Sequence, residues 1–269
     1  MATRRQQSEV HSQHGAIETR HSRARSRRAA IGSAVLIAAL AAAPAGAGTS
    51  GGAKAGPVPT ARSVGGQPGN TPDARTQLLG ASLAEWTQRF WIRAMSIPLN
   101  VNPVSDTTGI HCGISQEWPV WFLAASAGSA LNLNCTIPGG RVILVPASSY
   151  LADYPCPKEF GFEPAPGQTL ESFLSYWAAY VGIDGVTAKV TLDGKSVPLR
   201  RVNSGLFAFA GAADMVTADP CITGAPQLGV ADGLYAFIDP PSRGKHTLLI
   251  QSTSPILGET QNTIVLNIQ

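Results

Sequence analysis

Side chains suited to chemistry gather in a polar stretch from Asn102 to Glu117. The stretch holds carboxylates, hydroxyls, amides and one imidazole, and loops held by a rigid scaffold often carry functional sites. Asp106 and Glu117 are its two carboxylates, and glycoside hydrolysis uses two carboxyl groups at a set separation. Because two threonines follow Asp106, a hydrogen-bonded turn is the alternative. The two carboxylates are therefore candidate catalytic residues, with turn formation as the competing interpretation.

Two histidines follow the first 47 residues, His111 within this polar stretch and His246 after Arg243-Gly244-Lys245. A serine or cysteine nucleophile that needs an imidazole base would have to use one of them. The G-x-S-x-G match at 48–52 lies in the Gly-rich stretch after the signal and not between a strand and a helix, so it is not read as a nucleophile elbow. Both histidines have a simpler interpretation as loop or surface residues. They remain weak catalytic candidates.

No pattern in the sequence indicates a metal or cofactor. Paired Cys/His spacing of the zinc type is absent, and so is the D-x-D-x-D-G spacing of a calcium loop. Four aspartates fall in expected loops of the C-terminal half, and the Asp232-Gly233 pair favours a tight turn: Asp214, Asp219, Asp232 and Asp239. We therefore expect no metal and no cofactor.

Two tryptophans lie at the start of an apolar run. With the two-residue period of a strand, Trp121 and Leu123 share one face, whereas Trp118 lies beside the turn and is the one expected in solvent. An exposed aromatic ring can stack on a sugar ring. Trp118, with Gln116 beside it, is thus the candidate ligand-binding residue, although packing in the core or at an edge is the alternative.

The chain has four cysteines, Cys112, Cys135, Cys156 and Cys221. An even number in an exported chain predicts two disulfides, and three pairings are possible. We favour Cys112–Cys135 and Cys156–Cys221, because strands expected at 119–125 and 132–138 would form a hairpin through the small residues 126–129 and bring the first pair together.

Two segments have helical periodicity. The first begins with the capping box Ser82-Leu83-Ala84-Glu85 and ends before Pro98. The second begins at Thr169 and ends at Gly182, which suits the C′ position of a helix. The aromatic stripe of each helix, with Trp86 and Phe90 on the first and Phe173, Trp177 and Tyr180 on the second, is expected to face the core.

Short strands account for most of the remainder. The run at 141–146 (RVILVP) predicts a strand buried on both faces, and Asp193-Gly194 is a strong hairpin signal between 188–192 and 196–199. Further strands are expected at 206–210, 234–238, 245–251 and 263–268. This pattern predicts a mainly β fold, an antiparallel β-sandwich of jelly-roll or immunoglobulin-like type with two inserted or flanking helices.

The N-terminus has the plan of a secretory signal peptide. Seven arginines precede an apolar run at 29–43, and Ala45-Gly46-Ala47 matches a small-residue cleavage site. We expect cleavage after Ala47. Arg27-Arg28 before the apolar run is compatible with twin-arginine export, so the choice between that route and general secretion stays open. The product would be secreted, cell-surface or periplasmic, and the membrane would be met only through the signal.

After the signal, residues 48–80 are rich in Gly, Pro, Ala, Ser and Thr, which predicts a flexible linker. Residues 81–269 then form a single domain. Removal of the arginine-rich signal changes the net charge from +3 to about −2, because the first 47 residues hold seven arginines and two glutamates. The basic character therefore belongs to the signal, and no nucleic-acid partner is indicated.

Several short motifs together resemble a family of uncharacterised exported bacterial proteins. The resemblance spans nearly all of residues 86–250 and implies a shared β-rich fold but no known activity; members have a longer apolar-aromatic strand where this chain has RVILVP. The matching motifs are Trp91 with Ser96–Pro98, Asn102-Pro103, Asp106–Gly109 before Cys112, Gln116, Val120–Ala124, Cys135 with Pro138–Gly140, Val230–Tyr235 and Gly244–Thr247.

These observations favour an exported, non-catalytic binding or surface-interaction domain whose extracellular ligand could be a carbohydrate or a cell-surface polymer. An extracellular hydrolase acting on glycans and a structural envelope-associated protein are the alternatives. Two carboxylates, or a histidine with a carboxylate, in one pocket would favour the hydrolase. A large exposed apolar patch would favour the structural protein.

Overall fold

The structure, a computed structural model, describes residues 79–124 and 130–269. The expected signal peptide and nearly all of the expected linker lie outside the described residues. Within the described part, strands predominate and two α-helices are inserted among them, so a mainly β fold with two helices is confirmed. None of the described helices is long and apolar enough to cross a membrane.

The first helix, α3 (Leu83–Ser96), has the predicted capping box. The Glu85 N–H donates to the Ser82 hydroxyl, and the Ser82 N–H donates to the Glu85 carboxylate. These bonds satisfy two N–H groups that have no partner inside the helix. Trp86 and Phe90 are buried, as their spacing predicts.

The second helix, α4 (Leu170–Gly182), begins after Thr169, as predicted. The position expected for Gly182 is wrong, because it is the last helical residue and not the C′ residue. A Cβ at Gly182 would lie 2.5 Å from the carbonyl oxygen of Asp232, so the glycine allows close packing on the sheet.

The aromatic stripe of α4 faces the core only in part. Phe173 is buried, but Tyr180 is 43% exposed, and the prediction is wrong for that ring. Tyr180 stacks on Tyr176, which is 59% exposed, with 6.1 Å between ring centres. Three short 3-10 helices complete the helical elements of the described residues, at Leu99–Val101 (η1), Lys158–Phe160 (η2) and Ala213–Thr217 (η3).

The described strands form two five-stranded sheets in a sandwich-like arrangement. The first sheet contains β1 (Val120–Phe122), β3 (Val142–Tyr154), β8 (Pro226–Ile238), β6 (Leu199–Asn203) and β7 (Phe207–Ala210), and both β6 and β7 pair with β8. The second sheet has the order β2 (Ala130–Ile137), β10 (Gly258–Ile268), β9 (Gly244–Ser254), β4 (Thr187–Leu192) and β5 (Lys195–Val197).

The sheets are mixed, which differs from the fully antiparallel expectation. β1 pairs in parallel with β3, and β2 pairs in parallel with β10, whereas the other pairs are antiparallel. β1 and β2 therefore belong to different sheets, and the predicted hairpin between them is wrong. The expected turn at 126–129 lies outside the described residues. The jelly-roll or immunoglobulin-like type stays a prediction.

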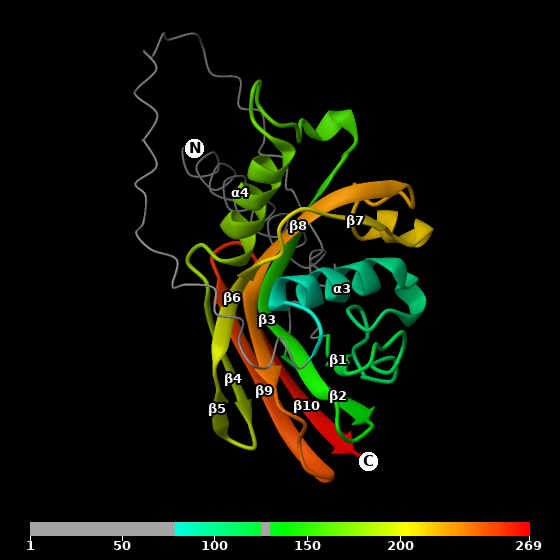
Figure 1. Cartoon of the computed structure of the whole chain (residues 1–269), viewed down its shortest axis with the longest axis vertical. Coiled ribbons are helices and arrows are strands. Elements are labelled where there is room, and N and C mark those ends of the chain that lie inside the picture. Colours follow the sequence, from blue (N-terminus) through cyan, green and yellow to red (C-terminus); the bar gives the residue numbers. More distant parts are fainter. Residues whose placement is uncertain (1–78, 125–129) are drawn as a thin grey trace, which may run out of the picture.

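The long strands β3 and β8 run through the middle of the domain with α3 on one side (Figure 1). Ile143 and Val145 pack against the second sheet, whereas Leu144 packs against α3. The RVILVP strand is thus buried on both faces, as predicted. Beyond a register shift between Pro146 and Ser148, α4 covers the ribbon through Phe173, Leu174 and Ala178.

Two turn predictions have opposite outcomes. Asp193 and Gly194 join β4 to β5 with φ values of 50° and 76°, as the Asp-Gly signal predicts. Asp232 and Gly233 do not form a turn but lie inside β8. A Cβ at Gly233 would be 2.3 Å from that of Ser149 on β3, so the glycine permits a close approach of two strands.

Both predicted disulfides are present, Cys112–Cys135 and Cys156–Cys221. The first forms for a different reason from the predicted hairpin. The loop before Cys112 runs along β2, where the Asn134 N–H donates to the Thr108 carbonyl at 3.0 Å. Gly109, with φ of 89°, makes this approach possible, because a Cβ there would lie 2.2 Å from the Asn134 carbonyl oxygen.

Candidate functional site

The polar stretch after α3 is anchored on the C-terminal end of that helix. The buried side-chain amide of Asn102 donates to the carbonyls of Ala94 and Ile97, at 2.7 and 2.8 Å. The guanidinium of Arg93 donates to the carbonyls of Ile114 and Ser115. Burial lowers the pKa of Arg93 to about 10, so it remains charged at neutral pH. Contacts with α3 thus fix both ends of the loop, and the disulfide fixes Cys112 within it.

Asp106 organises the turn within this loop. Its carboxylate accepts hydrogen bonds from the Thr108 N–H, the Thr108 hydroxyl and the His111 N–H, at 2.7, 2.7 and 2.8 Å. Desolvation raises the pKa of Asp106, but the bonds from His111 and Thr108 outweigh it, and the net shift is downward. The geometry matches the turn interpretation and brings only the main-chain N–H of His111, not its half-buried ring, to the carboxylate.

Gln116 and Glu117 are both engaged with other parts of the protein. The Gln116 amide donates to the carbonyls of Cys112 and Phe122 and accepts from the Phe122 N–H. The Glu117 carboxylate pairs with the guanidinium of Arg89. Gln116 therefore fastens the loop to β1, and the carboxylates of Asp106 and Glu117 face different partners.

Trp118 projects from the surface beside this loop. Its side chain is 65% exposed, whereas Trp121 is buried between the sheets with Leu123, as the strand period predicts. The guanidinium carbon of Arg141 lies 4.7 Å from the centre of the Trp118 ring and 6.0 Å from that of Trp121. Arg141 thus packs against both rings, and its guanidinium covers one face of the exposed Trp118 ring.

His246 lies in a constellation that has the elements of a serine-hydrolase triad. Its Nδ1 is 2.7 Å from an Asp193 carboxylate oxygen, and its Nε2 is 3.4 Å from the Ser242 hydroxyl. Nε2 is closer, at 2.9 Å, to the Ser242 carbonyl, to which it must donate. The hydrogen bonds that the ring makes to Asp193 and to the Ser242 carbonyl raise the pKa of His246. While Nε2 donates to the Ser242 carbonyl, it has no lone pair available to accept the proton of the Ser242 hydroxyl.

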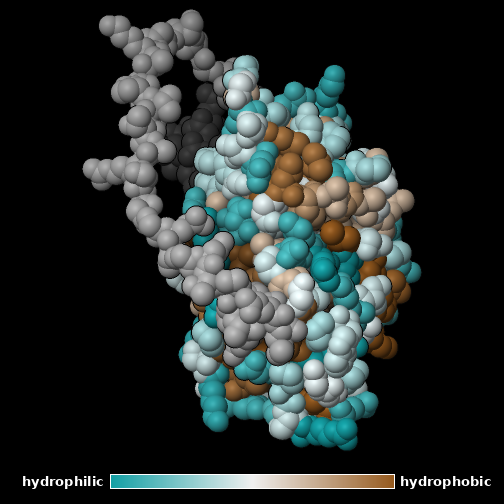
Figure 2. Space-filling model, in the orientation of Figure 1, coloured by the Kyte–Doolittle hydropathy of each residue, from teal (hydrophilic) through white to brown (hydrophobic). Residues whose placement is uncertain are grey.

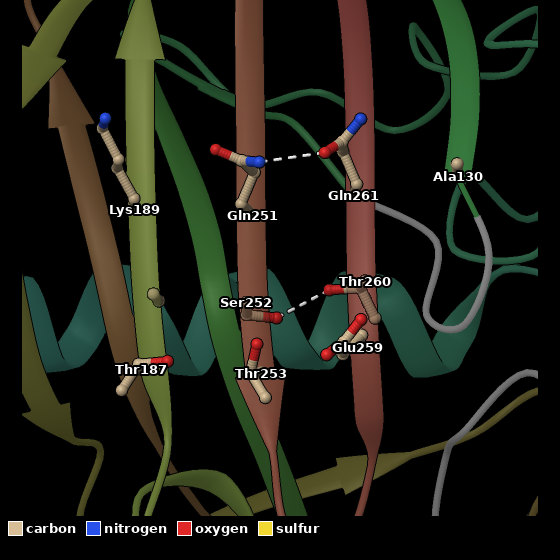
Figure 3. Close-up of a pocket in the computed structure, with 10 residues that line it drawn as sticks. Ala130, Thr187, Lys189, Gln251, Ser252, Thr253, Glu259, Thr260 and Gln261 are labelled. Atoms are coloured by element: carbon tan, nitrogen blue, oxygen red, sulfur yellow. Dashed lines mark hydrogen bonds between the residues drawn. The ribbon is translucent and has the colours of Figure 1, made fainter.

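A shallow open groove of about 590 Å³ crosses the second sheet. The Gln251 amide donates to Gln261 at 2.9 Å, and the Ser252 and Thr260 hydroxyls are hydrogen-bonded at 2.6 Å (Figure 3). Ten residues of β2, β4, β9 and β10 line it, including one ammonium and one carboxylate: Ala130, Thr187, Ala188, Lys189, Gln251, Ser252, Thr253, Glu259, Thr260 and Gln261. Hydroxyl and amide groups dominate, so the groove suits a neutral, polar ligand.

A separate pair of carboxylates, Asp153 and Asp219, is buried inside the domain. An oxygen of Asp153, an oxygen of Asp219 and the Sγ of Cys221 all lie within 4.8 Å of one another. Burial, followed by the charge of Asp219, raises the pKa of Asp153 well above its ordinary range. Burial also raises the pKa of Asp219, to about 6. Because Cys221 is in a disulfide, only the oxygens could bind a cation.

Sequence reasoning gave no site role to Asp153, Arg141 or Asp193, nor to the residues that line the groove. Asp153 ends a strand that was predicted to stop at Pro146, so nothing marked it as a partner of Asp219. The support of Trp118 by Arg141 depends on the parallel pairing of β1 with β3, which places Val120 opposite Val142. A mixed pairing of this kind leaves no local signal in the sequence. The contact between Asp193 and His246 also could not be predicted, because the two residues are 53 positions apart in the sequence.

Comparisons with known proteins give no family assignment. No family model matches the chain, and no curated protein matches it. A solved structure described as the solution structure of amebosin aligns with 52% of this chain and 97% of its own, at 12% identity and a TM-score of 0.17. A TM-score this low carries no argument about fold or function.

The two disulfides do bear on compartment. Disulfides form and persist in oxidising surroundings and are rare in the cytosol. All four cysteines of the chain are oxidised in the structure, and none is free. The domain is therefore suited to an extracytoplasmic environment.

Proposed function

We propose that the protein is an exported, non-catalytic binding domain whose ligand is a carbohydrate or a carbohydrate-containing cell-surface polymer. The N-terminal signal, removed after Ala47, would deliver it, and the segment 48–80 would link it to its surroundings. Trp118 is the residue that contacts the ligand by stacking on a sugar ring.

The observation that carries the proposal is the exposure of Trp118 together with its support by Arg141. A ring that is 65% exposed leaves much apolar surface in water, and covering that surface with a ligand would be favourable. One side of the ring is occupied by the guanidinium, 4.7 Å from the ring centre. The remaining side is available for the apolar face of a pyranose, which aromatic rings bind by stacking.

The polar groove on the second sheet supports the same ligand class. Sugar hydroxyls both donate and accept hydrogen bonds, as do the amides and hydroxyls of Gln251, Ser252 and Gln261. A shallow, open groove binds a segment of a polymer chain more readily than it encloses a small molecule. A long polymer could therefore use additional contacts here.

The two alternatives have weaker support. A hydrolase would need free carboxylates, but Asp106 accepts hydrogen bonds within its own loop and Glu117 pairs with Arg89. The residues that line the groove include one carboxylate, that of Glu259, and no histidine. For a structural envelope protein, a continuous apolar surface is expected. On the face shown in Figure 2, apolar residues instead form separate patches among hydrophilic ones.

Retention on insoluble polysaccharides tests the proposal. The purified protein is incubated with chitin, cellulose, xylan and peptidoglycan sacculi, and the bound fraction is measured. The proposal expects retention on at least one, with an affinity that falls by at least about fivefold in Trp118→Ala, if stacking of a sugar on one ring contributes as much as stacking of a nucleic-acid base, on the order of 1–3 kcal/mol. Tyr176→Ala, at another exposed ring, is the matched control. Equal retention of both variants would refute the role of Trp118.

A further inference from the structure

Two buried carboxylates lie close together without a visible counter-charge. Asp153 is at the end of β3, and Asp219 follows η3; their side chains are 3% and 0% exposed. Among the described residues, no lysine or arginine contributes to the pKa of either group. Two negative charges at this depth are costly, so a cation or a proton must neutralise them.

Unsatisfied oxygens mark the same place. The Asp219 Oδ1 accepts from the Cys221 N–H at 2.9 Å, but its Oδ2 has no partner in the described structure. Gln227, only 4% exposed, holds its amide against Asp153 at 2.9 Å, and its Oε1 is also unpartnered. Buried polar atoms are nearly always satisfied, so two unpaired acceptors beside an acidic pair point to an absent positive partner.

The surrounding main chain adds oxygens to this cluster. The Gln227 Nε2 lies 2.9 Å from Asp153 Oδ2, 2.7 Å from the Cys221 carbonyl oxygen and 3.3 Å from the Pro155 carbonyl oxygen. An amide nitrogen has two protons and cannot fully satisfy three acceptors. Oxygens from two chain segments, 153–155 and Cys221, thus surround the Gln227 amide nitrogen, and a half-turn of that amide would place its Oε1 among them.

We propose that Asp153, Asp219 and Gln227 form a binding site for a hard divalent cation of the calcium class. Calcium takes six to eight oxygen ligands at about 2.3–2.6 Å, so two ligand oxygens on one ion can be up to about 5 Å apart. The 4.8 Å limit within the cluster fits this geometry. The carbonyls of Pro155 and Cys221 are the nearest further donors.

The site would join the segment of Asp219, which lies outside the strands, to the paired strands β3 and β8. The Cys156–Cys221 disulfide already ties the loop after β3 to the loop after η3. A cation held by residues on both sides of this disulfide, with Gln227 at the start of β8, would add a second, reversible link. The ion would therefore stabilise the fold and take no part in glycan contact at Trp118.

Calcium titration of the protein provides the test. After EDTA treatment and gel filtration, CaCl₂ is added in a calorimeter, and thermal unfolding is followed with and without 1 mM CaCl₂. The proposal expects one bound Ca²⁺ per chain and a rise in Tm of about 5 °C or more at saturation. Asp219→Asn and Asp153→Asn should lose both effects, whereas Glu163→Gln, at an exposed carboxylate, should keep them.

The wild-type titration decides the question even if a variant fails to fold. Absence of bound Ca²⁺, with a Tm that does not respond to CaCl₂ but rises as the pH falls from 7 to 5, would mean that a shared proton neutralises the pair and would overturn the proposal. Binding that persists in both folded aspartate variants would place the cation elsewhere and would also overturn it. Neither result affects the test at Trp118.

Discussion

Arg141 connects an exposed tryptophan to a buried one. Its guanidinium carbon is 4.7 Å from the centre of the Trp118 ring and 6.0 Å from that of Trp121, which packs between the sheets. Its Nε and Nη1 have no hydrogen-bond partner in the described structure, and the guanidinium packs on the two rings. Arg141 thereby gives the exposed Trp118 ring a packing partner within the protein.

The first prediction follows from this support. Arg141→Ala should weaken glycan binding roughly two- to fivefold, because a cation–π contact at an exposed site contributes about 0.5–1 kcal/mol. Titration calorimetry with the retained polysaccharide's soluble fragments measures the change. The loss should be smaller than in Trp118→Ala, since the ring itself remains. An Arg141→Ala protein with unchanged affinity would show that the ring needs no support.

The second prediction concerns a buried carboxylate in the middle of β8. Asp232 is fully buried and accepts two hydrogen bonds from Arg201, at 2.9 and 3.2 Å, and a third from Asn203. Arg201→Ala should lower the free energy of unfolding by about 1–3 kcal/mol, because it removes the charged donor of a buried acceptor. Urea unfolding at neutral pH measures the loss.

The neighbouring arginine is the control for this experiment. Arg200→Ala, one position along β6, leaves the two bonds to Asp232 in place and should change stability less than Arg201→Ala does. If the two substitutions lower the free energy of unfolding equally, the hydrogen bonds from Arg201 to Asp232 contribute no measurable stability.

The third prediction is a pH dependence at the β4–β5 turn. The pKa of His246 is raised, mainly by its hydrogen bond to the Asp193 carboxylate and to a smaller extent by its hydrogen bond to the Ser242 carbonyl. A raised folded-state pKa stabilises the protein below the unfolded value of about 6.5, and this stability is lost as the pH rises through the folded value. The Tm should therefore contain a component that declines above about pH 6.5.

Asp193→Asn isolates this component. Asparagine tolerates the positive φ of the turn but lacks the charge that favours the imidazolium. The decline in Tm above pH 6.5 should be shallower in Asp193→Asn than in the wild type. The Asp153–Asp219 pair is common to both proteins, so its contribution cancels in the comparison. Identical pH profiles would contradict the assignment.

The fourth prediction is the position of signal cleavage. A peptide map of the exported protein, run without reduction, should begin at Gly48 and show the linked pairs Cys112–Cys135 and Cys156–Cys221. The signal plan and the oxidised cysteines both lead to this expectation. A mature chain that retains residues 1–47, or that contains free thiols, would contradict the proposed export.

Local signals in the sequence were sufficient for the elements but not for their partners. The Ser82 capping box, the helix start at Thr169 and the Asp193-Gly194 turn are each encoded within a few residues, and all three are present. The hairpin expected before Cys135 failed because β1 and β2 join different sheets through parallel pairings, and strand pairing depends on contacts remote in sequence.

Glycines show the same limit. The sequence marks Gly233 as a turn residue beside Asp232, but the structure needs it where β8 passes close to Ser149. Close approach and turn formation both favour glycine, and only the fold distinguishes them. The candidate site could be predicted only in part for a similar reason. The exposure of Trp118 follows from its position just before a strand, which the sequence shows, whereas its contact with Arg141 depends on the pairing of β1 with β3.

The most direct test of carbohydrate binding at Trp118 is an NMR titration of the tryptophan indole signals. The ¹⁵N-labelled protein is titrated separately with soluble fragments of chitin, cellulose, xylan and peptidoglycan. We predict that at least one fragment shifts the indole N–H signal of Trp118 and leaves that of the buried Trp86 in place. If none of the fragments moves the Trp118 signal, or if only the side-chain amides of Gln251 and Gln261 in the groove respond, the central claim is wrong.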